Sequence, residues 1–143
     1  MIINVNHKDK VLAIIIKKSY SKEGISFFTP DEFSQQLAYM EHKAGHDIVP
    51  HVHNEVHRNV LFTQEVLVIR KGVLRVDFYN DDKVYIESHM LNAGDVILLA
   101  SGGHGFQVIE DLEMFEIKQG PYSGEKDKSR FIGVTADSIQ LKE

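Results

Sequence analysis

The chain has 143 residues, 43% of them hydrophobic, which is enough for one packed domain. Its formal net charge is −5 and its 16 lysines and arginines are spread along the sequence, so we expect no nucleic-acid partner. The longest apolar run, Val11 to Ile16, is far too short for a membrane span. Cysteine is absent, so any transition-metal site must use His, Asp or Glu.

The first third of the chain predicts β-strands. The β-branched run Val11–Ile16 is typical of a strand, and the turn residues Lys22–Gly24 lead into a second strand, Ile25–Phe28. A hydroxyl, a proline and an acid in Thr29–Glu32 favour one short helical turn. Residues 36–42 alternate loosely and fit a further strand.

Strands also dominate the rest of the chain. Residues 65–71 and 73–79 are two apolar runs joined across Gly72, which predicts a meander. The further predicted strands are 84–90, 95–100, 105–109 and 112–119. After Gly120 the sequence becomes polar and charged, as expected for a surface segment. Apolar runs of this length, separated by turn residues, indicate an all-β barrel or sandwich with little helix.

The histidines are unevenly distributed. Four of the eight lie within twelve residues, and two of these, His51 and His53, are separated by a single residue. Residues two apart on a strand project from the same face, so both imidazoles can reach one ion. Glu65 begins the next apolar strand, and His104 follows a glycine turn. Imidazole and carboxylate ligands suit Mn, Fe, Co, Ni, Cu or Zn, and four such ligands leave octahedral positions open, as in catalytic sites.

These residues lie in two motifs that resemble those of the cupin superfamily. In the first motif, five residues separate Gly45 from the His51–His53 pair, and six separate Glu65 from Gly72. Eleven residues separate His53 from Glu65, where the family has three or four. The second motif begins at Gly94 and ends near His104, with alanine in place of the usual proline.

The resemblance implies a cupin double-stranded β-helix, or jelly-roll barrel, in which His51, His53, Glu65 and His104 bind a metal in the interior. It also implies one domain over residues 1–143, with the motif-bearing core at about 45–119. Strands from 11 to 43 would precede this core, and a polar segment, 120–143, would follow it. The family includes dioxygenases, isomerases, storage proteins and sensors, so the fold does not define the reaction.

Several residues admit other interpretations. Glu65 could be an exposed strand-edge charge, in which case Glu55 is the alternative carboxylate ligand. His57 is either a second-sphere donor or a surface histidine, and we favour the surface. Asp95 is expected to serve a turn. Glu116 and Lys118 share a strand face, where opposite charges are more often solvated than paired inward.

We therefore expect one divalent transition metal ion (Fe, Mn, Ni or Zn) and a small polar substrate. Gln64 and Tyr79 would orient that substrate, and no residue is assigned a catalytic role. A dioxygenase or an isomerase is expected. The alternatives are a non-catalytic metal- or sugar-binding module, and a metal-free sugar-nucleotide isomerase that uses histidine as acid and base.

The N-terminal residues and the strands lead to expectations about location and oligomeric state. Residues 1–4 do not resemble a secretory signal, so we expect a cytoplasmic protein without a membrane partner. Small β-proteins often pair through exposed sheet edges, so we expect a homodimer.

Overall fold

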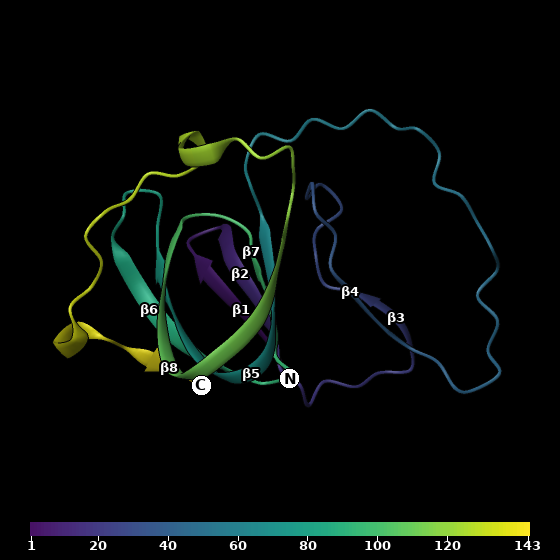
Figure 1. Ribbon diagram of the computed structural model, residues 1–143, viewed down its shortest axis with the longest axis horizontal. Helices are drawn as coiled ribbons and strands as arrows, with labels where there is room; N and C mark the ends of the chain where they lie inside the picture. Colours follow the sequence, from purple (N-terminus) through teal and green to yellow (C-terminus); the bar gives the residue numbers. More distant parts are fainter. The chain divides into compact units, whose positions relative to one another are not determined.

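The computed structural model describes residues 1–143 and confirms that the fold is mostly β (Figure 1). The chain forms two compact units. One unit comprises residues 1–20 and 62–143, and the other comprises residues 21–61. A jelly-roll topology remains a prediction. No helix is long and apolar enough to cross a membrane.

The larger unit is built on one seven-stranded sheet. Its strands lie in the order β1-β2-β7-β5-β6-β9, with β8 paired to β5. Their bounds are β1 Ile2–His7, β2 Lys10–Ile16, β5 Glu65–Tyr79, β6 Tyr85–Asn92, β7 Val96–Leu99, β8 Gly103–Lys118 and β9 Leu141–Lys142. All pairs are antiparallel except β6 with β9.

The longest pairing in this sheet joins β5 to β8, and it is bent. Gly72 has φ +80°, and the register shifts several times between Ile69 and Leu74. Figure 1 shows the result: β8, in green, has its bend at the bottom of the view and both of its ends at the top. The meander predicted across Gly72 is therefore wrong. A single glycine bends one continuous strand, because both halves of β5 pair with β8 and not with each other.

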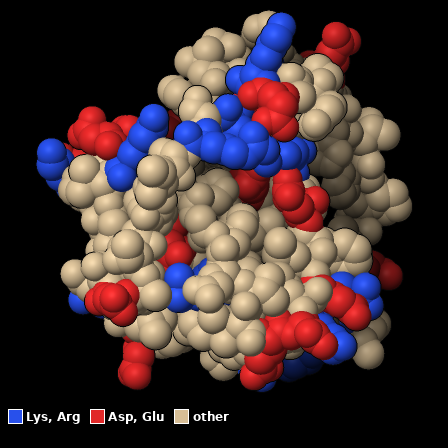
Figure 2. All heavy atoms as spheres, turned by 60° about the vertical axis from the view of Figure 1, so that its left-hand side comes forward, with Lys and Arg blue, Asp and Glu red and all other residues tan.

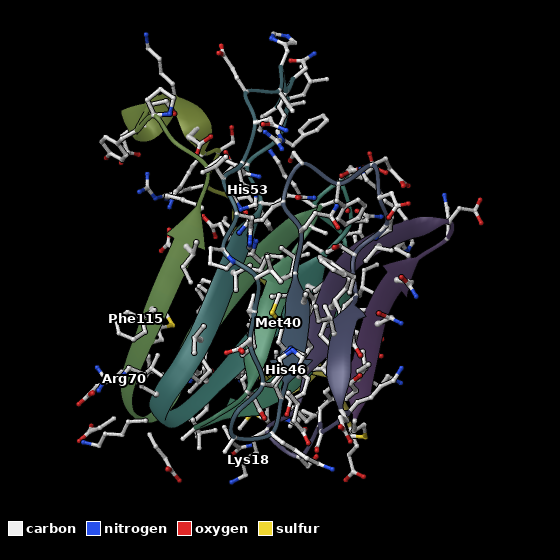
Figure 3. The ribbon with its side chains drawn as sticks, turned by 90° about the vertical axis from the view of Figure 1, so that its right-hand side faces the viewer. Lys18, Met40, His46, His53, Arg70 and Phe115 are labelled. Atoms are coloured by element: carbon white, nitrogen blue, oxygen red, sulfur yellow. The ribbon has the colours of Figure 1, made fainter.

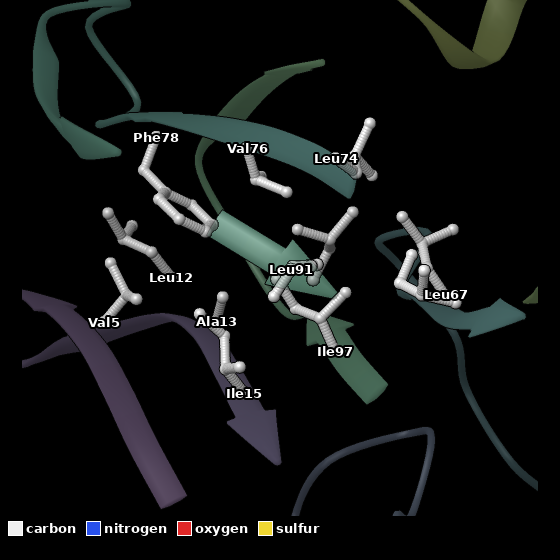
Figure 4. Close-up of a cluster of buried hydrophobic side chains, with 12 residues drawn as sticks. Val5, Leu12, Ala13, Ile15, Leu67, Leu74, Val76, Phe78, Leu91 and Ile97 are labelled. Carbon is white, nitrogen blue, oxygen red and sulfur yellow. The ribbon is translucent and has the colours of Figure 1, made fainter. Parts of the chain in front are cut away.

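The core of the larger unit lies on one face of the curled sheet (Figure 4). Alternate residues of β5 project to this face, as Leu67 and Ile69 do before the bend and Val76 and Phe78 do after it. The buried cluster comprises Val5, Leu12, Ala13, Ile15, Leu67, Ile69, Leu74, Val76, Phe78, Leu91, Ile97 and Leu99. This apolar burial is the main stabilisation of the unit, and it positions the polar side chains that share the same face.

The opposite face of β5 and β8 also carries cross-strand contacts. Val68 pairs with Phe115 in the antiparallel register. The guanidinium of Arg70 lies 5.2 Å from the centroid of the Phe115 ring, at the labelled position in Figure 3. Such a cation–π contact shields an aromatic ring that is 55% exposed.

The C-terminal segment packs on β5 and β6 through tyrosine hydroxyls. Tyr79 Oη accepts a hydrogen bond from the backbone N–H of Val134 at 3.0 Å, and Tyr85 Oη accepts one from Gln140 at 2.8 Å. The ring of Phe131 lies edge-on to Tyr79. The segment includes two short 3-10 turns, Gly124–Asp127 and Ala136–Ser138, so its polar sequence still docks at specific points.

The smaller unit contains a two-stranded sheet of β3 (Gly24–Phe27) and β4 (Ala38–Glu41). No helix forms after Thr29, where the chain makes only a single turn that is closed by the hydrogen bond from Phe33 N–H to the Pro30 carbonyl oxygen at 3.1 Å. The Thr29 hydroxyl instead donates to Gln36 at 2.7 Å and accepts the backbone N–H of Leu37 at 3.2 Å, so it closes the loop between the strands. Residues 42–61 have no regular secondary structure.

Acidic and basic side chains are intermingled on the face of the molecule seen in Figure 2. The largest group of basic side chains lies near the top of this view, and acidic side chains border it.

Candidate functional site

Glu65 is the first residue of β5 and projects to the core face of the sheet. It lies two positions before Leu67, which is 1% exposed, so both side chains point to the same side. Glu65 itself is 8% exposed. The alternative that Glu65 is an exposed strand-edge charge is therefore wrong. A carboxylate this deeply buried needs hydrogen bonds or opposite charges around it.

His104 supplies the first of these partners. It lies near the start of β8 and pairs in register with Phe78, a core residue, so its ring also projects to the core face. The bend of the β5–β8 pairing brings the beginning of β8 toward the beginning of β5. His104 Nε2 consequently lies 3.2 Å from Glu65 Oε2.

Lys118 is the second partner. It is directly opposite Glu65 in the β5–β8 register, and its ammonium lies 3.7 Å from Glu65 Oε1. The same ammonium lies 2.8 Å from Glu116 Oε1, and the Glu116 side chain is 42% exposed. The expectation that this acid–base pair is only solvated is wrong for Lys118, because its side chain is half-buried beside Glu65.

These partners shift the pKa of Glu65. The hydrogen bond from His104 is the largest influence and lowers the pKa of the carboxyl group below its usual value. Burial acts in the opposite direction. The charges of His104, Lys118 and Lys128 lower the pKa further, so the carboxylate form is favoured at neutral pH. The pKa of Lys118 is raised, chiefly by its hydrogen bond with Glu116, so the ammonium form is favoured as well.

Gln64 and Tyr79, the predicted substrate-orienting residues, are both buried. The Gln64 backbone N–H donates to the Gln119 side chain at 2.8 Å, which ties the start of β5 to the end of β8 beside Glu65. Tyr79 uses its hydroxyl to accept the Val134 N–H. The backbone of Gln64 is therefore fixed beside Glu65. The Tyr79 hydroxyl is instead engaged with the C-terminal segment. Their roles toward a substrate remain predictions.

His51 and His53 belong to the smaller unit, within residues 42–61. Their rings lie edge to face with centroids 5.2 Å apart, and both residues are exposed. His51 Nδ1 lies 3.0 Å from the carbonyl oxygen of Val49. Glu55 and His57 are exposed in the same segment. The structure thus brings together two of the four predicted ligands, Glu65 and His104, within one unit.

No group of three or more His, Asp or Glu side chains in the structure is arranged to hold a metal ion. Comparisons of the chain with protein-family models, with curated proteins and with solved structures found no significant match. The resemblance to cupins therefore depends on the residues of the two motifs.

Of the three residues that meet at the candidate site, Glu65, His104 and Lys118, it is Lys118 that had little support in the sequence. Lys118 lies near the end of the last long strand and belongs to no motif. The only local signal was its alternation with Glu116. Assigning its face required the pairing of β8 with β5.

Proposed function

We propose that this protein binds one divalent transition metal ion through Glu65 and His104. The separation of Glu65 Oε2 from His104 Nε2, 3.2 Å, is the observation that supports the proposal most directly. Ligand atoms about 2.1 Å from one ion, at octahedral or tetrahedral angles, are roughly 3.0 to 3.4 Å apart. Two donors of the right chemistry already have the spacing of adjacent ligands. That His51 and His53 are ligands as well remains a prediction from the sequence motif alone.

The proposed activity is that of a metal-dependent enzyme of the dioxygenase or isomerase type, acting on a small polar molecule. A bound ion would supply Lewis-acid polarisation of substrate oxygen atoms. The residues of this chain would provide the remaining functions. Glu65 is held as a carboxylate by its neighbours and is ready to ligate without first losing a proton. A non-catalytic metal-binding module would use the same ligands.

A second candidate function is metal-free acid–base catalysis. Lys118 places a positive charge beside Glu65, which balances the buried carboxylate without an ion. An imidazole hydrogen-bonded to a carboxylate is also a common arrangement for moving a proton, because the carboxylate orients the ring and stabilises its protonated form. His104 and Glu65 would then be the acid–base pair of an isomerase.

Calorimetric titration with Mn²⁺, Ni²⁺ and Zn²⁺ of protein free of affinity tags distinguishes the two candidates. We expect one ion per chain, with an affinity at least about tenfold lower in Glu65→Gln, in His104→Gln and in a His51→Ala/His53→Ala double variant. Glu55→Gln tests the alternative carboxylate and should leave the affinity unchanged. His7→Gln is the control for loss of a histidine elsewhere.

The outcomes exclude one another. Wild-type protein that takes up no ion contradicts the metal proposal and leaves the acid–base candidate. An affinity that falls in Glu55→Gln and not in Glu65→Gln would move the carboxylate ligand to the smaller unit.

A further inference from the structure

The segment that follows β8, residues 119–131, is attached at both of its ends beside the candidate site. The Gln119 side chain accepts the backbone N–H of Gln64 at 2.8 Å, and Gln64 directly precedes the site carboxylate in the chain. At the other end the ring of Phe131 packs on Gly103, where a Cβ atom would lie 2.9 Å from Phe131 Cζ. Gly103 directly precedes the site histidine. We call this segment, which joins the two flanks of the site, the strap.

The middle of the strap also reaches the site. Thr63, two positions before Glu65, donates a hydrogen bond from Oγ1 to Asp127 Oδ1 at 2.7 Å. The charge of Lys128 is one of those that lower the pKa of Glu65, so this ammonium group lies near the carboxylate. Figures 1 and 3, which are viewed at right angles, both show the first 3-10 turn beyond the end of the sheet at which β8 finishes. The strap therefore crosses the end of the sheet that carries the site.

The strap is held weakly between its two ends. None of residues 120–130 is buried. The hydrogen bond from Thr63 to Asp127 is exposed, and the ion pair of Arg130 with Glu125 is exposed and joins two residues of the strap itself. A segment with few buried contacts opens locally at a small cost in free energy. The middle of the strap can thus leave the sheet while the rest of the larger unit stays folded.

We propose that the strap is a gate over the Glu65–His104 site, closed by the hydrogen bond between Thr63 and Asp127, and that a small-molecule ligand enters when this bond opens. The inference rests on the proposed function in taking Glu65 and His104 as the functional residues, and it applies equally to the metal and the acid–base candidates. With the strap closed, the side chains of Glu65 and His104 are 10% and 30% exposed. The carboxylate is therefore almost covered until the strap opens.

The reaction of His104 with diethyl pyrocarbonate, which modifies neutral imidazole groups, measures opening of the strap without a metal or a substrate. Thr63→Val and Asp127→Ala each remove one side of the closing hydrogen bond. In both variants we expect modification of His104, followed by mass spectrometry of its peptide, to accelerate about fivefold. Glu125→Gln is the control, because it weakens an ion pair within the strap and should leave the rate unchanged. The exposed His51 provides the reference rate in the same molecule.

The reverse experiment holds the strap closed. The chain has no cysteine, so a Thr63→Cys/Asp127→Cys double variant carries two thiols that a short cross-linker joins selectively. We expect His104 to be modified about fivefold more slowly in the cross-linked protein than in the same variant with its two thiols capped separately.

Three results would overturn the gate. The first is modification of His104 at equal rates in the cross-linked and the capped proteins, because the strap then does not cover the ring. The second is acceleration that extends to His89, which is 3% exposed, because the whole fold is then loosened. The third is an effect of Asp127→Ala that Thr63→Val does not reproduce, because it then arises from the lost charge. Wild-type protein that takes up no metal ion contradicts the metal proposal alone, and the rates at His104 still decide the gate.

Discussion

His104 Nε2 lies 3.2 Å from Glu65 Oε2, although Glu65 pairs in register with Lys118, at the opposite end of β8 from His104. The two ends of β8 meet at one carboxylate because the β5–β8 pairing bends in its middle. The bend therefore determines both the curvature of the β5–β8 pair and the geometry of the candidate site.

Gly72→Ala should destabilise the larger unit. A Cβ atom at this position would lie 2.1 Å from the Asp111 carbonyl oxygen, and φ is +80°. Backbone strain and the clash together should cost roughly 3 kcal/mol of unfolding free energy, measured by urea denaturation. Gly124→Ala is the matched control, since its φ is +68° and no atom lies within 4 Å, so only about 1 kcal/mol is expected. Equal losses in the two variants would show that Asp111 does not close the bend.

The stability of the metal-free protein should fall in acid through Glu65. Because the folded-state pKa of Glu65 is lowered, the unfolded chain binds the proton more readily. The stabilisation is present above the usual carboxyl pKa and is lost as the pH falls through the folded value. Glu65→Gln should be roughly 1 kcal/mol less stable than wild type at pH 7, and the difference should shrink as the pH falls below the usual carboxyl pKa. A difference that stays constant over this range would mean that ionisation of Glu65 has no part in it.

Tyr79→Phe should loosen the C-terminal segment. The variant removes the phenolic oxygen that accepts a hydrogen bond from the Val134 N–H at 3.0 Å. Amide exchange at Val134 should accelerate about fivefold, in line with a lost hydrogen bond of roughly 1 kcal/mol. Tyr85→Phe is the counterpart and should accelerate exchange at Gln140 instead. If Tyr79→Phe changes ligand affinity and not exchange, the predicted substrate role of Tyr79 gains support over the anchoring role.

Asp95→Asn should affect stability without affecting metal affinity. Asp95 is 1% exposed and accepts hydrogen bonds from Lys17 Nζ at 2.5 Å, from Lys18 N at 2.8 Å and from Asn92 N at 2.8 Å. Removing the charge leaves Lys17 without its partner carboxylate, at a cost of about 3 kcal/mol in thermal or urea unfolding. Lys10→Met, which breaks an exposed pair with Asp81, should cost under about 1 kcal/mol. Metal affinity that fell with Asp95→Asn would contradict its purely structural role.

The sequence by itself determined the β-character of the chain and most of its strand positions. Strands over Val11–Ile16, 25–28 and 84–90 correspond to β2, β3 and β6, because residue propensity and turn residues act locally. The chemistry of Glu65 and His104 as candidate ligands was also evident, since residue type and motif spacing are properties of the sequence.

The tertiary structure decided which residues meet. Glu65 and His104 are 39 positions apart, and the register of β5 with β8 and the bend at Gly72 bring them together. The same register placed Lys118 beside Glu65. A glycine between two apolar runs predicts a turn, whereas in the structure Gly72 bends one continuous strand. Register and curvature are set by packing against distant strands, and no local pattern encodes them.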